Sequence, residues 1–149
     1  MTLEQQVFII IFALFNLLIF FRGVNMTVHK RNSFGLTEPL VFIGAFVWGD
    51  VVVLAPFWII VSIISFVAQN WYLFLLFVSV FWTVRSIGET MYWFNQQFST
   101  INRNPPEKLK GYRFTRNSSI WFIYQLIYQC IAVISLVASM YFANQWLKG

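Results

Sequence analysis

Residues 71–98, WYLFLLFVSVFWTVRSIGETMYWFNQQF, decide the fold. The stretch carries no charge as far as Val84, and as a helix it is long enough to cross the roughly 30 Å hydrocarbon core of a bilayer. Arg85 and Glu89 then stand one helical turn apart in its second half. A charged side chain at the bilayer centre costs about 2.5–3.5 kcal/mol on insertion scales, so an ionisable residue there usually has a partner and a function.

Three further segments have the same apolar character, and the composition agrees with them. The chain has 149 residues, of which 59% are hydrophobic, 21% aromatic and 10% charged, whereas a soluble domain has about 25% charged residues. We therefore predict an all-α polytopic membrane protein, a four-transmembrane-helix antiparallel bundle that forms a single transmembrane domain over residues 1–149. The spans are expected at about 3–21, 39–66, 71–98 and 118–146.

The basic residues outside the spans predict the orientation. The loops at 22–38 and 99–117 carry eight of the ten lysines and arginines, and Lys148 alone lies on the opposite side. Cytoplasmic loops of membrane proteins are enriched in Lys and Arg. Both basic loops are thus expected in the cytoplasm and both termini outside, most simply in the plasma membrane of a bacterium (the inner membrane).

The same distribution of charge argues against a nucleic-acid partner, because the net charge of +5 comes from loops that flank the spans. Cys130 and His29 are the single cysteine and histidine, which excludes an intrachain disulfide, a cysteine metal site and a bis-histidine haem within one chain. There is no HExxH motif and no glycine-rich phosphate loop. We expect no metal and no cofactor, and a role other than that of an enzyme.

Three ionisable residues form the predicted polar centre: Asp50, Arg85 and Glu89. On a continuous helix from residue 39, Asp50 lies about 16 Å into the membrane, and Arg85 lies about 9–10 Å from the cytoplasmic edge. Two acids against one base leave one negative charge, which a proton, a cation or another chain has to balance. Arg85 reaches either acid, and the trio is either an ion- or proton-binding site or a structural clamp.

Supporting polar residues are expected from Asn16 in the first span and from Gln125 and Gln129 in the fourth. Such amides also serve as simple contacts between helices, worth about 0.6 kcal/mol each.

The second basic loop has a composition suited to the lipid headgroup region. Its cations Lys108, Lys110, Arg113 and Arg116 are interleaved with Leu109, Tyr112 and Phe114. Each basic residue near an anionic leaflet gains about 1 kcal/mol. We expect contact with anionic lipids of the cytoplasmic leaflet, and the alternative is that these charges only enforce topology.

Three hypotheses for function follow. The first is a small cation- or proton-linked transporter or channel-like permease, working as a homodimer. The second is an accessory or assembly subunit of a larger membrane complex, whose charges pair with a partner's spans. The third is a lipid-handling protein, with the polar site facing headgroups.

Overall fold

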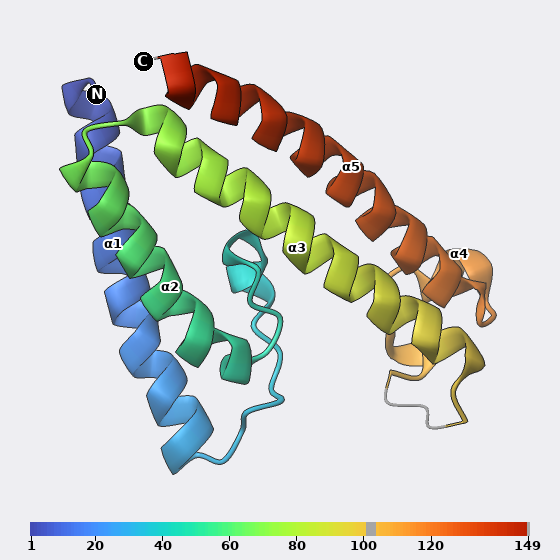
Figure 1. The fold of residues 1–149 in the computed structure, drawn as a ribbon. Helices are drawn as coiled ribbons and strands as arrows, with labels where there is room; N and C mark the ends of the chain where they lie inside the picture. Colours follow the sequence, from blue (N-terminus) through green and yellow to red (C-terminus); the bar gives the residue numbers. More distant parts are fainter. Residues whose placement is uncertain (101–103, 149) are drawn as a thin grey trace. The chain divides into compact units, whose positions relative to one another are not determined.

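The computed structural model describes residues 1–100 and 104–148 and is predominantly helical (Figure 1). Its long helices are α1 (Leu3–Val24), α2 (Trp48–Val67), α3 (Trp71–Phe98) and α5 (Ser119–Lys148). All four are long and apolar enough to cross a membrane, which confirms the predicted helical class. By its internal contacts the chain divides into two compact units: unit 1 (Met1–Phe77 with Phe142–Gly149) and unit 2 (Val78–Tyr141).

In unit 1, α1 and α2 form an antiparallel pair (Figure 1). At one end of the pair, the Met1 amino group donates to the Gln69 carbonyl at 3.2 Å and the Gln6 amide donates to the Gln69 side chain at 2.7 Å. At the other end, Gly23 of α1 lies against Val51 in the first turn of α2. The end of α1 continues as a π-helical turn, η1 (Asn25–His29), so the first helical segment extends beyond its predicted limit near residue 21.

The packing of α1 on α2 follows from residues that recur every three or four positions, which places them on one face of each helix. Several of these residues are small, and small residues let two helix backbones approach closely. The buried set comprises Ile9, Asn16, Ile19 and Gly23 from α1, with Val51, Ala55, Trp58, Val61, Ser62 and Ser65 from α2.

An aromatic cluster joins the first turn of α3 to α1. Phe8 contacts Trp71 and Phe74 edge-on, with ring centroids 5.7 and 6.1 Å apart. Phe12 contacts Phe74 and Trp58 in the same way, both at 5.7 Å. Edge-to-face contacts at these distances add to the apolar burial that holds the elements together.

The predicted second span, residues 39–66, is not one helix. It divides into a 3-10 helix, η2 (Glu38–Ile43), and α2, which begins only at Trp48. Gly44 ends η2 in the left-handed conformation with φ 79°, a geometry that glycine adopts without steric cost. Depths counted along a continuous helix from residue 39 are therefore wrong for this segment.

In unit 2, α3 and α5 run antiparallel and are joined by a folded connection. Gln97 near the end of α3 contacts Gln125 near the start of α5. Between them, the connection contains a 3-10 turn, η3 (Pro106–Lys108), and a short helix, α4 (Tyr112–Thr115). Residues 101–103 of the predicted loop 99–117 lie outside the described residues.

Candidate functional site

Residues 33–47 form a hairpin between the end of the first helical segment and α2. Its two limbs meet at an antiparallel bridge between Leu36 and Val47, and the Thr37 amide donates to the Phe46 carbonyl at 3.0 Å. Where the second limb enters α2, the Gly49 amide donates to the Ser33 carbonyl at 2.8 Å. These bonds give several backbone groups of the segment the partners that buried backbone requires.

The tip of the hairpin is η2, and it closes on itself. The Thr37 hydroxyl donates to the Ala45 carbonyl at 2.8 Å, and the Gly44 amide donates to the Val41 carbonyl at 2.8 Å. Thr37, Ile43 and Ala45 are almost completely buried. The tip is therefore a packed element of unit 1 and not a loose loop.

Two contacts show how far the tip extends along the α1–α2 pair. The Trp58 indole donates to the Ile43 carbonyl at 2.9 Å, and the Phe42 ring packs on Phe15 with centroids 5.6 Å apart. Trp58 lies about 15 Å along α2 from its start, and Phe15 lies about 14 Å from the end of α1. Both contacts place the tip halfway along helices that match the roughly 30 Å hydrocarbon core.

Asp50 lies at the base of this hairpin, so the count along one continuous helix that gave its predicted depth does not apply. It is the third residue of α2, and its Oδ2 accepts from the Phe46 amide at 2.9 Å and from the Val47 amide at 3.3 Å. A carboxylate in this place satisfies donors that the first turn of a helix leaves open, and it suits the positive end of the helix dipole. Asp50 thus fixes the point where the second limb becomes α2.

A cation lies at the same end of the helix pair. The Arg22 guanidinium, in the last turn of α1, is 5.4 Å from the centre of the Trp48 ring. This distance is within the range of a cation–π contact.

Arg85 and Glu89 form an ion pair within α3, with Nη2 and Oε1 3.2 Å apart. The sequence left open whether Arg85 pairs with Asp50 or with Glu89. The structure shows the ion pair with Glu89, which lies on the same helix. The two side chains are 27% and 15% exposed, so the pair is only partly buried. Tyr128 of α5 lies near enough to interact electrostatically with both charges.

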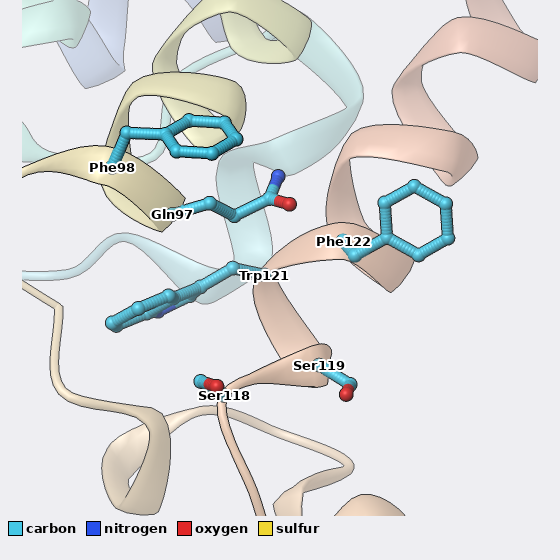
Figure 2. Close-up of a pocket in the computed structure, with 6 residues that line it drawn as sticks. All are labelled: Gln97, Phe98, Ser118, Ser119, Trp121 and Phe122. Atoms are coloured by element: carbon cyan, nitrogen blue, oxygen red, sulfur yellow. The ribbon is translucent and has the colours of Figure 1, made fainter.

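Further polar side chains extend the α3–α5 contact toward the connection. The Gln97 amide donates to the Gln125 side chain at 2.7 Å, and Trp93 packs on Tyr124 with ring centroids 4.7 Å apart. Figure 2 shows Gln97 and Trp121 in a pocket at this end of unit 2, which Phe98, Ser118, Ser119 and Phe122 complete. Gln125 was predicted from the sequence as a supporting residue, but its partner Gln97 was not.

One face of α3 also carries buried polar atoms that have no hydrogen-bond partner in the described part of the chain. They are the Ser86 and Thr90 hydroxyls and the Trp93 indole nitrogen. Their spacing of four and three residues places them on one side of the helix, beside Glu89. Buried polar groups of this kind are ordinarily satisfied by water, an ion or another molecule.

The other two predicted supporting residues differ in their burial. Asn16 is fully buried in the α1–α2 contact, where its amide donates to the Phe12 carbonyl at 2.8 Å. Gln129 is exposed on α5 and borders a shallow pocket that includes Thr90.

No group of three or more His, Cys, Asp or Glu side chains lies close enough to hold a metal ion within residues 1–100 and 104–148. Comparison with protein-family models, with characterised proteins and with solved structures finds no match to this chain.

Proposed function

We propose that this protein is a small channel-like permease for a cation or proton, embedded with both basic loops in the cytoplasm. The single observation that carries the proposal is the 33–47 hairpin, whose tip contacts Trp58 and Phe15 halfway along two helices of membrane-spanning length. Backbone that is not a continuous α-helix occurs at membrane depth where it is packed in protein or lines a water-filled cavity. Re-entrant segments and selectivity filters of channels are of this kind.

The Arg85–Glu89 pair is the proposed ionisable element. An acid at membrane depth is a common proton or cation site, and a neighbouring arginine tunes the acid by its charge. The buried hydroxyls of Ser86 and Thr90 on the same side of α3 favour a hydrated neighbourhood for this acid. In this proposal Asp50 positions the hairpin, and Glu89 carries the proton or binds the cation. The plasma membrane and a homodimeric state complete the proposal.

The test of the hairpin is a flux measurement on the purified chain in liposomes that contain a pH-sensitive dye. Trp58→Phe keeps an aromatic ring but removes the donor to the Ile43 carbonyl, and an unsatisfied buried carbonyl costs about 1–3 kcal/mol. We expect proton flux to fall by at least about fivefold, the equivalent of about 1 kcal/mol. The matched control is Trp146→Phe, because Trp146 is exposed near the end of α5.

Wild-type flux equal to that of empty liposomes would refute the permease. Equal loss in both tryptophan variants would show that the effect is not specific to the hairpin.

The ionisable element has its own test. Glu89→Gln keeps the size of the side chain and removes its titration, so the pH dependence of flux should disappear while the chain still inserts. Glu107→Gln, in the exposed connection, is the control and should leave the pH profile unchanged. An unchanged pH profile in the Glu89→Gln protein would show that Glu89 does not carry the proton or bind the cation. It would not contradict the role of the hairpin.

A second candidate function is an accessory subunit of a larger membrane complex, and Gln129 favours it. Its carboxamide is exposed on α5 among exposed Leu126, Ile127 and Val133. A polar amide on a lipid-facing surface gains from a hydrogen bond to another helix. Stoichiometric co-purification of a membrane partner that is lost in Gln129→Leu would establish this function over the permease.

A further inference from the structure

The connection between α3 and α5 folds onto the ends of both helices through specific contacts. The Trp121 indole donates to the Asn104 carbonyl at 3.0 Å, and the Tyr124 hydroxyl donates to the Lys110 carbonyl at 3.2 Å. The Asn104 amide also bonds to the Tyr92 hydroxyl. Residues 104–116 therefore have a defined position at the end of unit 2.

The inner side of this connection is apolar. Leu109 and Tyr112 pack against a core of Trp93, Ile120 and Trp121. Gly111, with φ 88°, turns the chain between these two inward residues. Arg113 and Phe114, which follow Tyr112 on the short helix α4, are exposed.

The outer side combines cations with one large apolar side chain. Phe114 is 94% exposed, and it is flanked by Arg113 and Arg116. Lys108 and Lys110 are exposed as well, and Glu107 is the one acid among residues 104–116. We name the set Lys108, Lys110, Arg113, Phe114 and Arg116 the basic clip.

The place of the basic clip in the chain decides its partner. It follows the end of α3 and precedes the start of α5, and both helices are long and apolar enough to span a membrane. A connection between two spans lies at the membrane surface, where phosphate groups and the upper parts of acyl chains meet. Its excess of positive charge complements anionic headgroups, and the exposed ring of Phe114 suits the adjoining apolar layer.

We propose that the basic clip binds the headgroups of anionic phospholipids in the leaflet at its own end of the helices, with Phe114 inserted below the phosphates. The four cations attract the anionic lipid and Phe114 sets the depth of the contact. This inference goes beyond the proposed permease and does not depend on it, since it requires only that α3 and α5 span the bilayer.

The test uses the full chain in nanodiscs of phosphatidylcholine, with or without phosphatidylglycerol. Cys130 is the single cysteine, so Cys130→Ser with Phe114→Cys gives one labelling position for an environment-sensitive dye. We expect blue-shifted emission, quenched by brominated phosphatidylglycerol more strongly than by brominated phosphatidylcholine. The preference should weaken at high salt, because screening reduces attraction between exposed charges.

Neutralising the cations tests whether their charges attract anionic lipid or serve only to set the topology of the chain. Lys108→Gln, Lys110→Gln, Arg113→Gln and Arg116→Gln together should abolish the preference for brominated phosphatidylglycerol, and each single change should lower it by up to about fivefold. Lys148→Gln, at the other end of α5, is the matched control and should leave the preference unchanged. Equal quenching by both lipids in the labelled chain that keeps all four cations, or dye emission typical of water, would overturn the proposal.

Discussion

Unit 1 and unit 2 differ in the polar groups that they place among apolar helices. Unit 1 buries side chains such as Asn16 and Ser62 and also backbone groups of the 33–47 hairpin, which Thr37, Asp50 and the Trp58 indole satisfy. In unit 2 the backbone is helical through the α3–α5 contact, and the polar groups are side chains such as Arg85, Glu89 and Gln97. Irregular backbone thus requires a close-packed frame, whereas polar side chains require only a partner across one helix turn or one helix contact.

The largest expected effect in this comparison concerns the ion pair of unit 2. Arg85→Leu removes the positive charge that pairs with Glu89 and should destabilise the protein by about 2–3 kcal/mol, because an acid in a membrane helix is costly without a cation beside it. Arg85→Leu combined with Glu89→Leu should recover most of the loss, since apolar residues replace a buried pair at little cost. Reversible unfolding in mixed micelles measures both, and a double variant no better than the single one would contradict the pair as the relevant unit.

The next effect concerns the close packing of unit 1. A Cβ atom at Gly23 would lie 2.8 Å from Val51 Cγ1, in a fully buried contact, so Gly23→Ala should destabilise by about 1–3 kcal/mol through overpacking. Gly88→Ala is the matched control in unit 2, because a Cβ there meets nothing within 4 Å. Since alanine is the better helix former, the control should gain up to about 1 kcal/mol. Thermal unfolding of the two variants in the same detergent should therefore shift in opposite directions.

A smaller effect is expected at the base of the hairpin. Asp50→Ala removes the acceptor for the Phe46 and Val47 amides and should cost about 0.5–2 kcal/mol, as other helix caps do. Asp50→Asn keeps a side-chain oxygen there and should cost less. Urea unfolding of the two variants measures the difference. An asparagine variant as unstable as the alanine variant would show that the charge, and not the acceptor, matters at this position.

The smallest effect concerns the amide contact of unit 2. A double-mutant cycle of Gln97→Leu and Gln125→Leu should give a coupling energy of about 0.6 kcal/mol, the usual size for polar contacts between membrane helices. The same cycle with Gln129→Leu in place of Gln125→Leu should give none, because Gln129 is exposed on α5. Equal coupling in both cycles would mean that the contact is not specific.

The long helices could be predicted from the sequence because hydropathy and length alone specify them. The same criterion missed the hairpin, since residues 40–47 are as apolar as a helix and hydropathy reports transfer into lipid, not conformation. Gly44 was a local indication of a break, but the partner that holds the tip, Trp58, lies fifteen residues after Ile43. That contact depends on tertiary packing.

The residues of the candidate site also differ in whether the sequence could predict them. The Arg85–Glu89 pair follows from four-residue spacing on one helix, so the sequence was sufficient to name both residues. The depth predicted for Asp50 was counted along a helix that begins nine residues later than assumed, at Trp48 instead of Pro39, so that count does not hold. Gln97 and Tyr128 were missed because their roles come from the contact between α3 and α5, which no spacing within one segment reveals.

The anchoring of the hairpin has a consequence for biosynthesis. Ile43 leaves the ribosome before Trp58 does, so the tip emerges when its indole donor has not yet been made. Phe15 is already available in α1, and it supplies the earlier of the two contacts. The hairpin can therefore take its final place only after α2 has been synthesised through Trp58 and has paired with α1, which sets an order of events during insertion.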